Sequence, residues 1–469
     1  MEDRPICRNL TKTTIKGTVL RSYIMAEEQF DFTAKAKKTL TILAVVGIVL
    51  FGLGAFLVGN SEHDAEGHEA KATEEVHTTT ADAEHASGET QGEAVHEGAH
   101  AEEHSPLLKR IYANLWINNL YFVGLALLGV FFVAIQYVSQ AGWSAALIRI
   151  PMSFSSWLPI GGVLTLLIFL FGGHDIFHWT HAYLYVEGTP DYDPIIAGKA
   201  AFLNTPFFLA RMVVYFVVWY LMFRWIRNKS LEEDKIGGDK YFHKLRGISA
   251  GFIVFFAVTS STAAWDWVLS IDTHWFSTMF GWYVFSSWWV TALAAITLVT
   301  VLLKEAGYLK IVNTGVLHDL GKFVFAFSIF WTYIWFSQFM LIYYSNIPEE
   351  TIYFIERLSS DHYSKVFFVN LILNFFFPFL VFMPRDSKRH TVFLKIVTII
   401  VLIGHWFDFY LMVTPGVMKE NGGFGFLEIG MAMVFGVAFL FVALRSLAKY
   451  PLVAKNHPMI EEAKHHSVF

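Results

Sequence analysis

Ten long apolar stretches limit what this chain can fold into more than any other feature of its sequence. Each has close to the roughly 20 residues that an α-helix needs to cross a hydrocarbon core about 30 Å thick. The stretches are continuous rather than alternating in polarity, which favours helices over a transmembrane β-barrel. Of all residues, 55% are hydrophobic and 16% are charged, and the mean hydropathy is +0.45. The sequence therefore predicts an all-α polytopic membrane protein with spans near 39–59, 116–137, 155–173, 208–226, 248–270, 279–303, 321–344, 366–383, 391–413 and 425–445.

Basic residues gather on one side of these predicted spans. They fill the loops at 224–246 and 385–395, precede the first span and follow the last one. Because Lys and Arg are retained in cytoplasmic loops, both termini are predicted to be cytoplasmic. We therefore expect a cytoplasmic segment at 1–38, a first transmembrane helix at 39–59, an extracytoplasmic loop at 60–110, a nine-helix membrane domain at 111–445 and a cytoplasmic tail at 446–469.

The N-terminal segment shows a change of pattern at Met25. Residues 1–24 are basic and patternless, whereas Met25 begins an amphipathic lead into the first span. We hypothesise that residues 1–24 are an over-extended start. Since residues 1–38 hold no apolar core of the kind a cleaved signal peptide needs, the first span is expected to act as its own insertion signal.

The segment 60–105 is rich in Glu, Asp and His and almost free of large apolar residues. Such a composition cannot pack a core. Two interpretations are open: a solvated acidic linker, which the lack of regular ligand spacing favours, and a tract that collects metal ions.

Cysteine use limits the cofactors that the chain can hold. Its one cysteine, Cys7, lies outside every predicted span. A haem c attachment motif and a cysteine-ligated iron–sulfur cluster are thereby excluded, so no covalently bound cofactor is expected. If the protein takes part in electron transfer, such redox centres belong to other subunits.

Ionisable residues inside the spans fall mostly toward the predicted outer side, where they are expensive to bury and often mark function. At the end of the third span, His174 and His178 would share one face if the helix continued past them, with Asp175 between them. Contact with protons or a quinone headgroup, structural hydrogen bonding, and a metal or haem site all fit this arrangement, although metal or haem would need further ligands.

Later spans carry more residues of the same kind. Asp266 lies between two Trp residues near the outer end of the fifth span, and His405 and Asp408 are three residues apart and hence neighbours on a helix. Arg211 is the expected partner of Asp266 in a structural salt bridge, and Glu428 is a second ion-pair candidate. The candidates for a proton or quinone path are His174, Asp175, His178, Asp266, Asp272, Tyr333, Gln338, His405 and Asp408. No metal site and no certain catalytic residue are assigned.

Two local patterns predict helix contacts. The loop at 347–357 resembles a short interfacial helix that other subunits could dock against. Gly247 and Gly251 form a G-x-x-x-G motif, which weakly indicates a close contact between helices.

Two motifs, together with the ten-span layout, resemble the polysulfide-reductase (NrfD-like) family of membrane subunits over residues 39–445. One is Asp266-Trp267-x3-Ile-Asp272-x-His274-Trp275-Phe-Ser-Thr278-Met-Phe-Gly-x-Tyr283, and the other is Trp331-Thr-Tyr333-Ile-Trp335-Phe-Ser-Gln338-Phe339. More narrowly, the chain resembles the second such subunit, the ActF type, of alternative complex III, a bacterial quinol:cytochrome c oxidoreductase. The acidic insert at 60–105 and the region before Met25 depart from the family pattern.

The resemblance implies a fold of two four-helix bundles plus two flanking helices in the bacterial inner membrane. It implies partners: a multihaem cytochrome c subunit, an iron–sulfur subunit, a second NrfD-like subunit and, in some assemblies, a terminal oxidase. By motif position, the family's quinol site maps onto His174, Asp175 and Asp266, which leaves quinone binding or a quinone-free proton route open. Two alternative functions remain, an independent secondary transporter and a purely structural membrane anchor for redox subunits. The resemblance also implies that the chain is not catalytic alone.

Overall fold

The computed structural model describes residues 28–78 and 105–467 of the chain. Ten helical segments in these ranges are long and apolar enough to cross a membrane, which confirms the predicted all-α polytopic fold. The spans are α2 (Ala34–Thr78, apolar over Ala34–Asn60), α3 (Pro106–Ser139), α4, η2 and α5 (Arg149–Phe154, Ser155–Trp157, Leu158–Ile176), α7 (Thr205–Ile236), α8 (Asp239–Trp267), α9 (Phe280–Glu305), α10 (Thr314–Ser345), α12, η6 and α13 (Ser364–Leu371, Ile372–Phe376, Phe377–Phe382), α14 (Thr391–Met418) and α15 (Phe426–Leu447).

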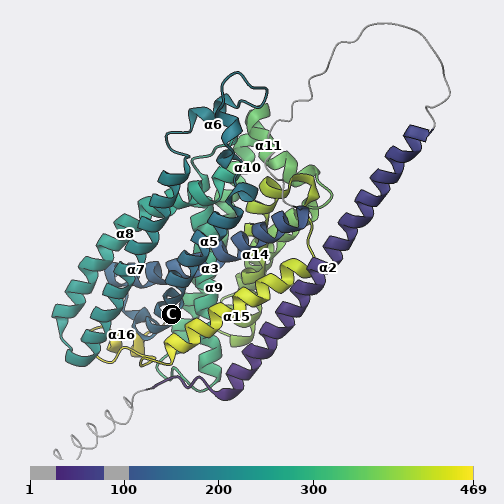
Figure 1. The fold of residues 1–469 in the computed structure, drawn as a ribbon. Coiled ribbons are helices and arrows are strands. Elements are labelled where there is room, and N and C mark those ends of the chain that lie inside the picture. The colour runs from purple at the N-terminus through teal and green to yellow at the C-terminus, as the bar shows by residue number, and fades with distance from the viewer. Residues whose placement is uncertain (1–27, 79–104, 468–469) are drawn as a thin grey trace, which may run out of the picture.

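Eight of the spans form two four-helix bundles, and the other two flank them (Figure 1). In the first bundle, α3, α5, α7 and α8 pack together; in the second, α9 and α14 pack with α10 and with the α12–α13 segment. The helices α3, α9 and α14 also contact one another across the bundle boundary and form the buried centre. The flanking helices α2 and α15 pack side by side along the edge.

Glycine allows α2 and α15 to approach closely. A Cβ added at Gly54 would lie 2.2 Å from the backbone N of Leu427, and one at Gly430 would lie 2.3 Å from the backbone N of Phe51. Small residues at such positions let helix backbones come together in a membrane. The G-x-x-x-G motif does not make such a close backbone contact: a Cβ at Gly247 meets no atom within 4 Å, and one at Gly251 meets only the end of the Met222 side chain, at 3.8 Å. The prediction for that motif was wrong, because Gly247 faces away from the neighbouring helices.

Short elements cover the two ends of the bundles. One end, which we call the acidic end, carries η3 (His178–Thr180), η4 (Ala182–Tyr185), α6 (Pro194–Gly198), η5 (Leu269–Ile271), α11 (Pro348–Ser359) and η8 (Lys419–Asn421). The other, the basic end, carries η1 (Gly142–Ala146), η7 (Asp386–Lys388), α16 (Ile460–His465), the start of α2, the turn between α7 and α8, and the end of α15. The short helix predicted in the 347–357 loop is α11.

Local sequence signals explain where several helices begin. Ser105 and Asn204 accept hydrogen bonds from the backbone N–H groups of Leu108 and Phe207, and each is followed within two residues by Pro. Such caps satisfy N–H groups that the first turn leaves unpaired, and proline tolerates that turn because it has no N–H to lose. The cap at Ser105 starts α3 ten residues before the apolar stretch that we predicted from position 116.

The first span is also longer than its apolar part. Its helix continues to Thr78, although the segment from residue 60 was expected to be a loop. Residues 61–78 are rich in Ala and Glu, which are strong helix formers. The rest of the predicted acidic tract, at 79–104, and the hypothesised start at Met25 lie outside the described residues.

Candidate functional site

The centre of the second bundle holds a carboxylate that neutral groups surround. Asp408 on α14 has no exposed surface. Its Oδ1 accepts hydrogen bonds from the Tyr283 hydroxyl (2.5 Å) and from Asn370 Nδ2 (3.0 Å). Its Oδ2 accepts from Ser287 Oγ (2.7 Å) and from Trp331 Nε1 (2.9 Å). Four donors from three neighbouring helices therefore occupy about as many acceptor positions as a carboxylate has.

His405 extends this group by one step, and the hydrogen bonds fix its tautomer. Ser287 Oγ lies 3.0 Å from His405 Nδ1, and the ring has no exposed surface. Because Ser287 has a single proton and gives it to Asp408, Nδ1 of His405 must be the donor in the second contact. His405 Nε2 is then a bare acceptor, and no described residue hydrogen-bonds to it. Asp408, Ser287 and His405 thus form a chain of three groups that can exchange protons.

A π-helical turn brings two amides toward this chain. The segment η6 interrupts the eighth span at its middle and carries Asn374, whose Nδ2 donates to Asn370 Oδ1 (2.6 Å). A Cβ at Gly404 would lie 2.3 Å from Asn374 Oδ1, so only glycine leaves room for this amide beside α14. Single π turns inside helices occur often at functional sites. We call the seven side chains Tyr283, Ser287, Trp331, Asn370, Asn374, His405 and Asp408 the polar hub.

A small cavity lies between Tyr283 of the polar hub and Arg357 at the acidic end. It has a volume of about 10 Å³ and is lined by Tyr283, Gln338, Tyr353 and Arg357 among others. This is close to the smallest space that holds one water molecule. Gln338 Nε2 is buried here and has no hydrogen-bond partner among the described residues. A water molecule in the cavity would satisfy that donor, and the Tyr283 hydroxyl reaches from the cavity lining to Asp408.

Asp266 in the first bundle is held very differently. Arg211 Nε and Nη2 donate to its two carboxylate oxygens at 2.7 and 2.9 Å, and Asp266 is 1% exposed. The guanidinium also lies over the rings of Phe202 and Phe207, 4.0 and 4.2 Å from their centroids. This bidentate pair between α7 and α8 has the geometry of a strong structural ion pair, the role anticipated for Arg211.

Glu428 also forms a buried ion pair, but with a residue that the sequence reasoning missed. Arg110 Nε and Nη2 donate to it at 2.7 and 2.9 Å, and Asn114 Nδ2 donates at 3.1 Å. Arg110 precedes the apolar stretch of the second span, so we had placed it in a loop. Because α3 begins at Pro106, Arg110 lies on the helix and faces α15. The available signal was the helix-capping pair Ser105-Pro106, which predicts a helix start ahead of the apolar stretch.

Asp272 lies at the acidic end, where it helps to fix α11. Its carboxylate is 3.4 Å from Arg357 Nη2 and 3.6 Å from Lys419 Nζ. Arg357 is only 2% exposed and also donates to the backbone oxygens of Leu411 and Met412 on α14. It is another residue that sequence reasoning missed, and its place on the apolar side of a short amphipathic helix was the only signal.

The histidines after the third span lie at the surface of the acidic end. The helix α5 ends at Ile176, so His174 and His178 do not share a helical face, which corrects that expectation. The ring of His181 lies between them, 5.5 Å from the His174 ring and 5.7 Å from the His178 ring. Partial burial and the neighbouring positive charge lower the pKa of both His178 and His181. Asp175 is partly buried at the end of α5.

The structure therefore divides the predicted path residues among several places. His405 and Asp408 join in the polar hub, and Gln338 lines the cavity beside it. Asp266 takes its contacts from Arg211 rather than from His174 or Asp175. Tyr333 is 65% exposed on the outer surface of α10 and does not join the hub. In the described part of the chain, no three His, Cys, Asp or Glu side chains are arranged to hold a metal ion.

Comparison with known proteins leaves the site to be interpreted from its own geometry. No family model matches the sequence, and no curated protein matches it significantly.

Proposed function

We propose that this chain is a membrane subunit without redox centres in a respiratory quinol:cytochrome c oxidoreductase of the alternative complex III type, and that its polar hub handles protons. The observation that carries the proposal is Asp408: a fully buried carboxylate in a membrane span that no described Lys or Arg pairs with. Ionisable groups in such positions commonly mark proton relays. The NrfD-like motifs supply the assignment to this class of complex.

The hub has a chemistry suited to proton transfer. A proton that arrives through the cavity would pass from the Tyr283 hydroxyl to Asp408, which loses no cation partner when it becomes neutral. With Asp408 neutral, the hydrogen bonds of Ser287 would reverse: Asp408 would give its proton to Ser287 Oγ, Ser287 would give its own to His405 Nδ1, and His405, by then in the tautomer that holds its proton on Nε2, would release that proton. Uptake of a proton by Asp408 strands no cation, whereas a proton on Asp266 would leave the Arg211 guanidinium without its counter-ion.

In this proposal the acidic end faces the outside of a bacterial inner membrane, since the basic end collects the Lys and Arg that cytoplasmic loops retain. The partners are a multihaem cytochrome c subunit, an iron–sulfur subunit and a second NrfD-like subunit. The helix α11, held by Arg357, would give them a rigid docking surface. Quinone, if this subunit binds it, would approach from the same side.

A secondary transporter is the less favoured function. Such transporters usually have paired broken helices around a midplane substrate site. Among the described spans, the π turn η6 breaks the eighth span at its middle, whereas the interrupted span of the first bundle, Arg149–Ile176, is broken by η2 (Ser155–Trp157) near its start at the basic end, so the two breaks do not face a common midplane site. The cavity beside the hub has room for water only. A purely structural anchor would not require the unpaired Asp408.

Purification from native membranes in a mild detergent tests the assignment to a complex. We expect the chain to co-purify with haem c and iron–sulfur subunits, in a particle that oxidises quinol and reduces cytochrome c. Isolation of the chain alone under conditions that preserve other respiratory complexes would refute the proposal. The haem absorbance and the iron content of the particle are the decisive measurements.

The proton role has its own test within that particle. We expect Asp408→Asn to lower the number of protons released per quinol while all subunits remain assembled. The matched control is Thr165→Val, which removes a buried hydrogen bond from Asn119 in the other bundle (2.7 Å) and should leave the proton yield unchanged. Equal proton yields in wild type and Asp408→Asn would contradict the proton role and favour a purely structural anchor.

A further inference from the structure

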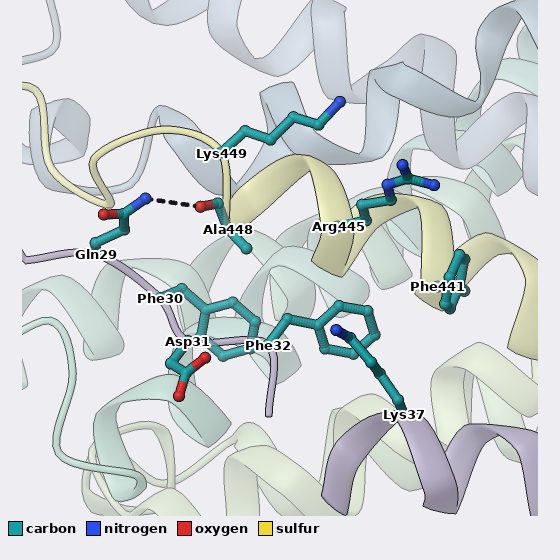
Figure 2. Close-up of a pocket in the computed structure, with 9 residues that line it drawn as sticks. All are labelled: Gln29, Phe30, Asp31, Phe32, Lys37, Phe441, Arg445, Ala448 and Lys449. Atoms are coloured by element: carbon teal, nitrogen blue, oxygen red, sulfur yellow. Dashed lines mark hydrogen bonds between the residues drawn. The ribbon is translucent and has the colours of Figure 1, made fainter. Parts of the chain in front are cut away.

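A cavity of about 760 Å³ lies at the basic end, between the segment before α2 and the end of α15. Figure 2 shows its lining, with Arg445 on the last turn of α15, Lys449 on the chain just after it, and Phe30 and Phe32 on the segment before α2. The two sides are fastened together, because Gln29 Nε2 donates to the backbone oxygen of Ala448 (2.9 Å). The backbone N–H of Leu452 likewise donates to the oxygen of Glu28 (2.9 Å). The cavity therefore has two walls that are held in place.

Positive charge dominates this cavity. Lys37, Arg445 and Lys449 line it with a single carboxylate, that of Asp31. None of the three cations is in an ion pair among the described residues, and Lys37 Nζ lies 5.3 Å from the centroid of the Phe32 ring. The two buried arginines of the spans described above, Arg110 and Arg211, are each paired with a carboxylate, so this unpaired group of cations stands apart. Unpaired cations around one cavity favour an anion as its occupant.

The position of the cavity indicates what the anion is attached to. Its two walls lie where the first span begins, at Ala34, and where the last one ends, at Leu447, so it opens at the edge of the membrane. The rings of Phe30, Phe32 and Phe441 form an apolar part of its lining. The adjacent surfaces of α2 and α15 are also apolar and exposed: Ile42 is 53%, Val45 54% and Leu440 38% exposed. A soluble anion needs no apolar surface beside the cations. A lipid needs cations for its headgroup and an apolar surface for its acyl chains.

We infer that this cavity binds the headgroup of an anionic phospholipid, in the class of phosphatidylglycerol or cardiolipin. The phosphate lies near Arg445 and Lys449, with Lys37 on the facing wall, and the acyl chains lie along the apolar surface of α2 and α15. Basic pockets between transmembrane helices at the membrane edge bind such headgroups. The lipid would fill the junction at which the flanking helices meet, independently of any proton path.

Native mass spectrometry of the full-length protein tests this inference. The protein is purified in detergent, exchanged into mixed micelles that contain equal amounts of phosphatidylglycerol and phosphatidylcholine, and its retained lipids are weighed. We expect wild type to retain phosphatidylglycerol at least tenfold over phosphatidylcholine. The variant Arg445→Gln/Lys449→Gln should lose this preference, while Lys449→Arg, which keeps the charge, should retain it.

Two controls separate the cavity from general surface charge. Lys240→Gln/Lys244→Gln removes two exposed cations at the same end but outside the cavity, and it should keep the full preference. Lys37→Gln changes the other wall and should lower the preference by itself, which covers the case that the double variant does not fold. Inorganic phosphate at millimolar concentration should not release the retained lipid.

Three results would overturn the inference. They are an unchanged preference in both Arg445→Gln/Lys449→Gln and Lys37→Gln, an equal loss of preference in the Lys240→Gln/Lys244→Gln control, and release of the anion by inorganic phosphate alone, which would identify a site for free phosphate. The measurement reads lipid retention and not quinol turnover, so it is independent of the proposed respiratory function.

Discussion

Asp266 and Asp408 are both buried carboxylates in membrane spans, yet their surroundings differ in kind. Asp266 meets a guanidinium in a bidentate pair, whereas Asp408 meets four neutral donors. Protonation of Asp266 would leave the buried Arg211 guanidinium without its counter-ion. The surroundings of Asp408 carry no such constraint. Burial of an acid in a membrane therefore does not by itself identify a functional group. The charge of its partners distinguishes a structural ion pair from a group that can transfer protons.

The largest expected effect on stability comes from breaking the ion pair between Arg211 and Asp266. Arg211→Gln leaves Asp266 as an uncompensated buried charge, and removal of one partner of a buried pair costs about 3–5 kcal/mol. We expect a large drop in the thermal unfolding midpoint, followed in detergent by tryptophan fluorescence. Arg211→Gln/Asp266→Asn should recover most of the loss, because both charges are gone. As a control, Lys229→Gln breaks a partly exposed pair with Glu232 and should cost less than about 1 kcal/mol. A double variant no more stable than Arg211→Gln alone would show that packing, not charge, holds α7 and α8 together.

Asp408→Asn should have a smaller effect on stability and a larger one on function. The amide nitrogen of Asn cannot accept the hydrogen bonds that one carboxylate oxygen accepts, and an unsatisfied buried donor costs about 1–3 kcal/mol. No ion is left unpaired, so the loss should be clearly below that of Asp266→Asn, which strands Arg211. Parallel unfolding curves of the two variants give the comparison directly. Equal losses would mean that Asp408 is as firmly fixed as Asp266, and the distinction between them would fail.

His457 at the basic end offers a third buried ionisable group, in a part of the chain outside the membrane. Burial and the positive charge of Arg149 lower its pKa from 6.5 to about 4. The folded protein therefore holds fewer protons than the unfolded chain between these values. This contribution to stability is complete above pH 6.5 and is lost as the pH falls toward 4.

A pH series measures that contribution. Between pH 8 and pH 6 we expect the free energy of unfolding to fall by about 1 kcal/mol on account of His457. The series is run in a Glu233→Gln background, because the buried Glu233 carboxyl at the same end also takes up a proton in this range and acts with the opposite sign. In that background, His457→Gln should lower the stability at pH 8 but flatten the dependence in this range, with Arg149 left in place as the neighbouring charged group. A slope that persists in His457→Gln would place the titration elsewhere. The result measures how much stability depends on a buried ionisable group whose charged neighbour, Arg149, has the same sign as its own charged form. Asp266, by contrast, has a neighbour of opposite sign.

The sequence predicted the fold more fully than the site, and particular residues show why. Hydropathy located all ten spans, because crossing a membrane constrains every residue of a span at once. The pairing of Arg211 with Asp266 was also expected from their places near the outer ends of two spans. The pairing of Glu428 with Arg110 was not, since it depends on a helix that begins before its apolar stretch.

The polar hub lies further beyond what sequence can predict. His405 and Asp408 were recognised as helix neighbours, but Tyr283, Ser287 and Trp331 come from two other helices. No periodicity within one chain segment specifies which side chains meet across three helices. The π turn at η6, which sets the angle of Asn374, likewise has no clear signal except Pro378 after it. Tyr333 was selected as a polar residue inside a span and lies at the surface, because polarity alone does not define which side of α10 faces inward.

The smallest expected effect on stability carries the sharpest test of the relay. Ser287→Ala removes hydrogen bonds to Asp408 and His405, and such bonds between membrane helices contribute about 0.6 kcal/mol on average. The unfolding midpoint should therefore hardly move. Proton release per quinol should nevertheless fall as strongly as in Asp408→Asn, because the only described group that touches both Asp408 Oδ2 and His405 Nδ1 is gone. Ser287→Thr keeps the hydroxyl and should restore the proton yield if its extra methyl group is accommodated; Ser287→Cys, with a weaker donor of similar size, should restore part of it. A normal proton yield in Ser287→Ala would mean that protons do not pass between these two residues, and Asp408 would then have to act with Tyr283 alone, on the side of the hub that faces the cavity.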